Sequence, residues 1–149
     1  MDTNRHDRIG FLMHDVARLI RLRFDAQSRA LGVTRPQWRA LLNLAHEPGL
    51  TQAELAERID VERITACRMV DRLAEAGLVE RRADPTDRRV WRLHLLPPSL
   101  AIVEKLTELG AAIEREALSH VSEEEARQLA ASLKRIRDGL REDSRRNVA

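Results

Sequence analysis

Three helix-boundary signals near the middle of the chain constrain its fold more than any other feature. Thr34 with Gln37, and again Thr51 with Glu54, have the Thr-x-x-Gln or Thr-x-x-Glu spacing of a capping box, which fixes the first turn of a helix. Gly77 follows a third segment of helical spacing and suits the left-handed conformation that often ends a helix. These signals predict three short helices in succession and argue against a β-sandwich.

The second and third of these helices are joined by a short turn, residues 60–62, and together have the pattern of a helix-turn-helix. A small residue, Ala56, lies in the first helix and an apolar one, Val61, lies in the turn. The second helix of such a motif enters the major groove of DNA. Its outward face carries the candidate DNA-binding residues Arg63, Thr65, Arg68 and Arg72. The alternative is a helical hairpin with a solvated basic face.

The stretch RRADPTDRRVWRL, residues 81–93, has five arginines around a turn. Residues 78–82 and 90–95 have the alternating pattern of short strands, and the loop between them contains the turn residues Asp84 and Pro85. A β-hairpin directly after a helix-turn-helix is typical of the wing of a winged helix. The alternative is a solvated hairpin tip with no partner.

Two arginines near the tip of this hairpin, Arg88 and Arg89, are further candidates for contact with DNA. An extended loop lets them reach a narrow groove, where the negative potential is strongest. Asp87 is a third candidate, because a carboxylate beside two guanidinium groups can hold one of them in a fixed direction. That restriction lowers the entropy lost when the loop meets DNA.

Long amphipathic helices are predicted on both sides of the winged helix. Before it, apolar residues recur at helical spacing from Ile9 to Phe24; after it, Pro97 begins one helix and Ser122 caps another. Apolar residues spaced by three and four follow in the last helix, at Leu129, Leu133, Ile136 and Leu140. Because one winged helix would not cover so much apolar surface, we expect a two-fold dimer. Packing within the monomer is the alternative.

The composition agrees with a helical protein, since 43% of the 149 residues are hydrophobic and 34% are charged, but only 3% are aromatic. The expected fold class is mainly α with a small β-hairpin wing: a winged helix-turn-helix plus N- and C-terminal dimerisation helices. Residues 34–96 form the DNA-binding region in this prediction. Residues 1–33 and 97–149 form the helical dimerisation region.

The stretch DPTDRRVWRLHL resembles the wing signature of the MarR family of bacterial winged-helix regulators, in which an Asp, one residue, an Arg and alternating aliphatic residues recur. Those positions are Asp87, Arg89, Leu93 and Leu95. VDRLAEAGLVERR is similar to the family's segment between recognition helix and wing, while Ile64 and Cys67 stand where small hydroxyl residues are usual, and Leu96 where a Thr is usual. The resemblance covers nearly the whole chain and implies a dimer formed by the N- and C-terminal helices.

A ligand site is also implied by this resemblance. Salicylate-binding members of the family have a Trp and two arginines at positions that match Trp38, Arg18 and Arg21. The arginines would pair with an anionic head group while an aromatic ring stacks on the indole, beside Leu42. We therefore expect a small aromatic carboxylate or phenol to relieve DNA binding. The alternative is that Trp38 belongs to the core and the arginines to a solvated face.

Catalysis, cofactors and metals have no candidate residues in the sequence. It contains no GxGxxG, no phosphate-binding loop and no supported Ser/His/Asp set, so we expect neither an enzyme nor a cofactor. The histidines lack the spacing of metal ligands; they are His6, His14, His46, His94 and His120. Cys67 is the only cysteine, is expected to be a structural thiol, and agrees with a reducing compartment.

The absence of a long apolar stretch predicts that the protein has no contact with membranes. A helix that crosses a bilayer needs roughly 18 consecutive apolar residues, and the polar start of the chain does not resemble a signal peptide. A cytoplasmic location is therefore expected.

The function expected from these features is a dimeric, sequence-specific transcriptional regulator, a repressor, that binds a pseudo-palindromic duplex and is released by a small aromatic or phenolic ligand. The alternative is a winged-helix module for protein interaction that binds DNA weakly or not at all. This alternative is kept because residues 51–96 contain nine basic and nine acidic residues.

Overall fold

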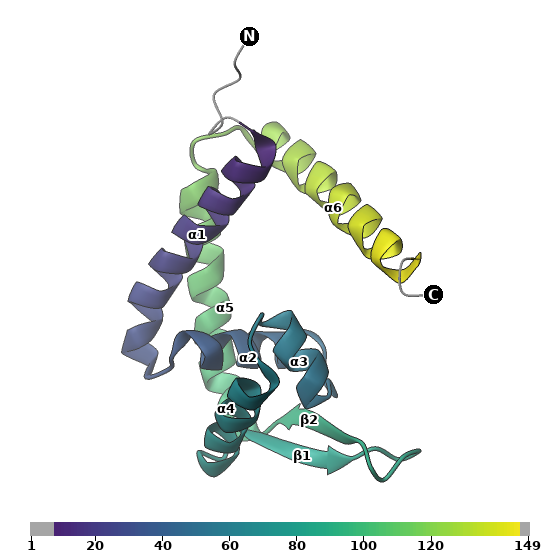
Figure 1. Cartoon of the computed structure of the whole chain (residues 1–149). Helices are drawn as coiled ribbons and strands as arrows, with labels where there is room; N and C mark the ends of the chain where they lie inside the picture. Colours follow the sequence, from purple (N-terminus) through teal and green to yellow (C-terminus); the bar gives the residue numbers. More distant parts are fainter. Residues whose placement is uncertain (1–7, 147–149) are drawn as a thin grey trace. The chain divides into compact units, whose positions relative to one another are not determined.

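Six α-helices, a short 3-10 helix and a two-stranded antiparallel hairpin make up the part of the chain that the structure, a computed structural model, describes: residues 8–146 (Figure 1). They are α1 (Ile9–Ser28), η2 (Arg29–Leu31), α2 (Arg35–His46), α3 (Gln52–Arg58), α4 (Arg63–Glu75), β1 (Val79–Ala83), β2 (Trp91–Leu95), α5 (Pro97–Leu118) and α6 (Glu123–Arg146). The mainly α fold with a small hairpin is confirmed. His6 and the ends of the expected dimerisation region, 1–7 and 147–149, lie outside the described residues.

The chain divides into two compact units at the junction between Ile113 and Glu114, which lies within α5. The first unit contains α1 to α4, the hairpin and most of α5. The second contains the end of α5 and α6. All the residues predicted to contact DNA or ligand belong to the first unit.

The predicted helix boundaries are confirmed by hydrogen bonds. The Thr34 amide donates to Gln37 Oε1 at 2.9 Å, and the Thr51 amide donates to Glu54 Oε2 at 2.7 Å, so that each capping box satisfies amides that a helix start leaves unpaired. Gly77 adopts a φ of 69° after α4, the left-handed conformation that an L side chain rarely accepts. These three points position α2, α3 and α4 one after another.

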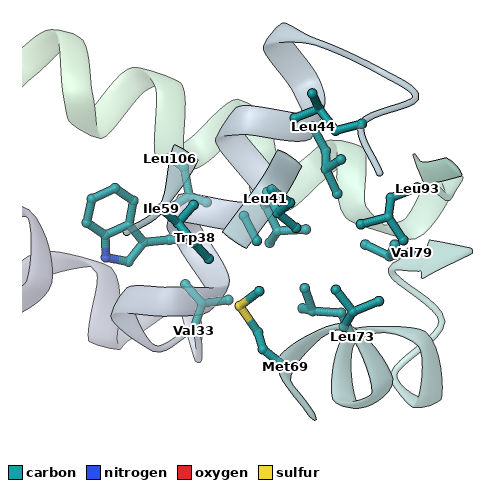
Figure 2. Close-up of a cluster of buried hydrophobic side chains, with 14 of the residues drawn as sticks. Val33, Trp38, Leu41, Leu44, Ile59, Met69, Leu73, Val79, Leu93 and Leu106 are labelled. Atoms are coloured by element: carbon teal, nitrogen blue, oxygen red, sulfur yellow. The ribbon is translucent and has the colours of Figure 1, made fainter. Parts of the chain in front are cut away.

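The core of the first unit forms where α2, α3, α4, the hairpin and α5 meet (Figure 2). Leu41 of α2 is fully buried at its centre, and Leu73, Val79 and Leu106 reach the same cluster from α4, β1 and α5. Trp38 also belongs to this cluster, at its edge in Figure 2, and is only 9% exposed. The winged helix is therefore held by side chains from every one of these elements.

Replacing Leu41 with alanine is expected to lower the free energy of unfolding by about 2–5 kcal/mol, because it removes a fully buried side chain and leaves a cavity in the core. Chemical denaturation monitored by circular dichroism measures this value. Leu100→Ala is the matched control, because Leu100 is 58% exposed and its loss should change stability by less than about 0.5 kcal/mol. Equal stabilities for the two variants would contradict this account of the core.

The hairpin pairs Val79 with Leu95 and Ala83 with Trp91, so both strands lie within one residue of the predicted ranges, 78–82 and 90–95. Strand β1 begins after Leu78 because the Leu78 amide donates to the Leu73 carbonyl at 2.9 Å, in the hydrogen-bond pattern that closes α4. That amide belongs to the helix end and not to the strand.

The loop between α2 and α3 runs along β2 and forms backbone hydrogen bonds with it. The Leu93 amide donates to the Leu50 carbonyl at 2.9 Å, and the Gly49 amide donates to the Leu93 carbonyl at 3.0 Å. Gly49 has a φ of 87°, and a Cβ there would lie 3.6 Å from the His94 ring. Backbone hydrogen bonds thus attach the base of the hairpin to the helix-turn-helix.

Two helices expose rows of apolar side chains. On α1, Ile9, Val16 and Leu19 are each more than half exposed. On α6, no residue whose side chain is described is buried, and Leu129, Leu133 and Ile136 are between 37% and 49% exposed. Each of these faces is apolar surface that its own unit leaves in water.

Within residues 8–146, no helix combines the length and apolar character needed to cross a membrane. In that same part of the chain, His, Cys, Asp and Glu side chains do not gather in groups of three that could hold a metal ion.

Candidate nucleic-acid interface

Helix α4 has one buried face and one exposed face. Ala66, Met69, Val70 and Leu73 are buried against the core and fix the rotation of the helix about its axis. Because 3.6 residues make one turn, the residues between them point to solvent. The four predicted contact residues are exposed; they are Arg63, Thr65, Arg68 and Arg72.

The turn between α3 and α4 sets the angle at which α4 is presented. Asp60 adopts a φ of 54°, which is rare for a residue other than glycine, and the Val61 amide donates to the Ala56 carbonyl at 3.0 Å. Val61 is half-buried against the core, as the sequence pattern predicted for the apolar residue of the turn. The helix-turn-helix is therefore a fixed unit.

Arg81 on β1 joins the hairpin to both helices of this motif. Its Nη2 donates to Asp71 Oδ1 of α4 at 2.6 Å and to Gln52 Oε1 of α3 at 3.1 Å. One guanidinium group thus bridges three elements and fixes the position of the hairpin relative to α4. Arg81 stood in the sequence only as one of five clustered arginines.

Asp84 organises the hairpin loop, a role that the sequence analysis did not assign to it. Its side chain is only 7% exposed, and its Oδ1 accepts from the Thr86 amide at 2.7 Å, the Thr86 hydroxyl at 2.6 Å and the Asp87 amide at 3.1 Å. Its other oxygen pairs with Arg92, which also donates to the Gly49 carbonyl at 2.9 Å. The signal available in the sequence was Asp two residues before Thr, the spacing of an Asx turn.

The hydrogen bond from the Thr86 hydroxyl, followed by the Arg92 guanidinium and the backbone amides, holds the pKa of Asp84 well below its usual range. A carboxyl group whose pKa is lower in the folded than in the unfolded state stabilises the fold above its unfolded pKa, about 3.9 for Asp. That contribution is lost as the pH falls through the folded value. The loop geometry is therefore maintained throughout the neutral range.

Replacing Asp84 with alanine is expected to free the Thr86 and Asp87 amides and to leave Arg92 without its carboxylate. Hydrogen exchange at neutral pH should speed up at those amides by about tenfold or more, the factor for loss of about 1.4 kcal/mol of protection. The Leu55 amide, which donates to the Thr51 carbonyl in α3, is the internal control and should be unchanged. Unchanged exchange at Thr86 and Asp87 would contradict the assignment of Asp84 as the anchor of the loop.

Arg88 and Arg89 lie in the loop of the hairpin, which extends away from α2, α3 and α4 in Figure 1, and both are exposed. Arg89, 91% exposed, pairs with Asp87 through Nε at 3.2 Å and Nη2 at 3.4 Å. The hydrogen bonds from Arg89 lower the pKa of Asp87, so the carboxylate remains charged at neutral pH. The sequence predicted that Asp87 holds one of the two arginines in a fixed direction. In the structure its partner is Arg89.

The remaining arginines of the hairpin are occupied by internal partners. Arg81 bonds to Asp71, Arg82 pairs with Glu80, and Arg92 pairs with Asp84. Arg81 and Arg92 also connect the hairpin to the helices and the loop beside it, whereas the Arg89–Asp87 pair lies at the exposed tip.

The predicted ligand-binding residues lie on α1 and α2, and their side chains differ in solvent exposure. Trp38 is buried: its Nε1 donates to Asp25 Oδ1 at 3.0 Å, and its ring lies 4.2 Å from the Phe24 ring, centroid to centroid. Arg18 is exposed and pairs with Asp15 at 3.3 Å, whereas Arg21 and Leu42 are half-buried. The indole is therefore packed on one side and hydrogen-bonded at its edge.

Arg39 of α2 is a neighbour of this group that the sequence analysis did not single out. Burial, and then the positive charge of Arg21, lowers the pKa of the Arg39 guanidinium below its usual value. The charge of the half-buried Arg21 on α1 thus acts on the half-buried Arg39 on α2.

Comparison with known proteins gives a consistent result. A family model described as MarR family matches residues 31–90. The chain is 34% identical over 113 residues to a Thauera aromatica protein assigned as a transcriptional regulatory protein for the hcr operon. That match covers 76% of this chain and 66% of the relative, so the chain spans just under two thirds of that relative's length.

Two solved structures extend this similarity to the fold. The transcriptional regulator SlyA is 29% identical, with a TM-score of 0.77 and coverage of 91% of this chain and 96% of that chain. The Mycobacterium tuberculosis MarR family protein Rv2887, solved in complex with salicylic acid, is 25% identical, with a TM-score of 0.73 and coverage of 86% and 95%. Rv2887 is also named an HTH-type transcriptional repressor.

Proposed function

This chain belongs to the MarR family and is a transcriptional regulator rather than an enzyme, and from this premise we propose that it binds a pseudo-palindromic DNA duplex as a dimer and acts as a repressor. The observation that carries the proposal is the link between two exposed cationic surfaces of one unit. The outer face of α4 carries Arg68 and Arg72, the hairpin tip carries Arg88 and Arg89, and Arg81 bridges the two elements.

The outer face of α4 enters the major groove in this proposal, and the hairpin tip reaches the flanking minor groove. Arg63, Thr65, Arg68 and Arg72 contact bases and phosphates, while Arg88 and Arg89, the latter oriented by Asp87, contact the groove. Half-sites lie about one helical turn, roughly 10 base pairs, apart.

The dimer is proposed because the family forms dimers and because both terminal helices expose apolar surface. A second copy of the chain covers the exposed faces of α1 and α6, which lie in the expected dimerisation region, 1–33 and 97–149. Residues 34–96 remain free to meet DNA.

Binding to a mixed DNA fragment at several salt concentrations tests this proposal directly. Contacts to several phosphates give a steep negative slope of log affinity against log salt. A slope near zero would favour the second candidate function, a winged-helix module for protein interaction. The nine basic and nine acidic residues in 51–96 are the observation that favours this second candidate.

A small aromatic carboxylate or phenol is proposed to release the DNA, with its anionic group at Arg18 and Arg21 and its ring beside Trp38 and Leu42. Support comes from the similarity to Rv2887, which was solved with salicylic acid, and from the half-buried position of Arg21. A ligand shifts the dimer only through different affinities for its DNA-competent and incompetent forms.

Addition of salicylate at millimolar concentration is expected to weaken DNA binding about 5- to 150-fold, the range of typical allosteric coupling. Measurements in a Trp91→Phe background leave Trp38 as the only tryptophan, so that its emission reports the site. Arg18→Ala should lower the response, because the carboxylate loses one cation, whereas Arg115→Ala on α5 should respond as the parent does. An unchanged response in Arg18→Ala would exclude this site.

A further inference from the structure

Ile64 is an exposed apolar residue on a helix face that is otherwise polar or charged. Its side chain is 61% exposed, in the first turn of α4. Single exposed aliphatic residues are common on protein surfaces, so exposure alone assigns it no role. Its position on α4 gives a stronger argument.

Ile64 points almost directly away from the core. At 100° per residue, Leu73 lies about 180° around the helix from Ile64, and Leu73 is fully buried. Arg68, one turn further along, shares the exposed face with Ile64, and Arg63 and Thr65 flank it in sequence. In a helix that lies in the major groove, this is the line of closest approach to the bases.

The major groove contains one apolar group that can receive such a side chain. Base edges there present hydrogen-bond donors and acceptors, except for the C5-methyl group of thymine. An isoleucine placed against the other edges would remove water from polar atoms and offer no hydrogen bond in return, which is unfavourable. Placed against thymine, it buries one methyl group at no such cost.

We propose that Ile64 is a specificity-determining residue that selects thymine at one position of each half-site through its C5-methyl group. The inference rests on the proposed function, because it requires α4 to lie in the major groove. A β-branched side chain has essentially one χ1 rotamer in a helix, so Ile64 loses little entropy on contact. Neighbouring Arg63 and Arg68 hold the helix on the phosphates and bases around that position.

The test uses duplexes selected from a random pool by the full-length protein. Each thymine of a selected half-site is replaced by deoxyuridine, which lacks only the C5-methyl group. Wild type should lose affinity about fourfold per half-site at one thymine, the effect of one buried methyl group, and about 15-fold when both half-sites are changed. Ile64→Ala should bind the thymine duplex less tightly and should show no further loss with deoxyuridine.

Two variants control for folding and for aliphatic side chains elsewhere. Ile64→Val keeps a β-branched side chain and should retain the sensitivity to deoxyuridine. Leu100→Ala removes an equally exposed aliphatic group on α5 and should behave as wild type. Thermal unfolding should be the same for all variants, because both residues are exposed.

The outcomes separate this inference from the function on which it rests. Suppose that the protein selects duplexes but that deoxyuridine lowers the affinity of wild type and Ile64→Ala equally, or lowers the affinity of neither. The proposed role of Ile64 is then wrong, and the proposal of DNA binding is unaffected. If no duplex is enriched, the proposed function is wrong, and the inference about Ile64, which depends on it, is wrong as well.

Discussion

Replacing both Arg88 and Arg89 with alanine is expected to lower the affinity for DNA about 1000-fold. A dimer loses four cationic contacts, and about 1 kcal/mol for each gives a total of about 4 kcal/mol. The slope of log affinity against log salt should also become shallower by about 3 to 4, because each phosphate contact contributes about 0.9. Fluorescence anisotropy with a labelled duplex over a range of salt concentrations measures both quantities.

The matched control for this experiment is Arg127→Ala with Arg137→Ala on α6, which removes the same charge outside the winged helix. Both arginines are paired on their own helix, with Glu124 and Asp138. This control should bind DNA about as wild type does. If Arg88 and Arg89 can be removed with no greater effect than Arg127 and Arg137, the hairpin is not a DNA-binding wing.

Deleting residues 126–149 is expected to convert the dimer into a monomer or an aggregate. A dimer covers six side chains that are about half exposed in a single copy, namely Leu129, Leu133 and Ile136 from each copy. Covering each one contributes about 1 kcal/mol to the free energy of association. Loss of about 6 kcal/mol raises the dissociation constant more than about 10,000-fold. Sedimentation velocity at micromolar concentration distinguishes dimer from monomer and aggregate.

A point variant tests the same surface without shortening the chain. Leu133→Glu with Ile136→Glu places charges on the apolar face of α6 and should also dissociate the dimer. Lys134→Glu is its control, because Lys134 lies about 100° from Leu133 around the helix and changes only the polar side. A well-folded dimer from the truncated chain, together with dimeric Leu133→Glu with Ile136→Glu, would show that this face packs elsewhere.

The helix boundaries could be predicted because they depend on interactions within a few residues. Thr51 and Glu54 satisfy each other's amides across three positions, and Gly77 supplies a conformation that its own lack of a side chain permits. The exposed face of α4 followed from helical periodicity in the same way. Strand β1 was predicted one residue early, because the amide of Leu78 is taken by the Leu73 carbonyl at the end of α4.

The roles within the hairpin could not be predicted in this way. The five arginines in residues 81–93 are chemically identical, and only their neighbours in space distinguish their roles. Arg81 bridges Asp71 and Gln52, which lie 10 and 29 positions away in the chain. Asp84, passed over as a turn residue, is the anchor because Arg92 and the loop amides converge on it.

The sequence alone determined the order of helices and hairpin, the family signature and the outer face of α4, since capping, periodicity and turn chemistry act over short stretches of chain. Only the tertiary structure decided which charged groups are committed to holding the fold and which remain at its surface. Trp38 illustrates the difference, because its hydrogen bond to Asp25 and its contact with Phe24 join α1 to α2. Such contacts depend on where distant segments meet, and local pattern does not specify that.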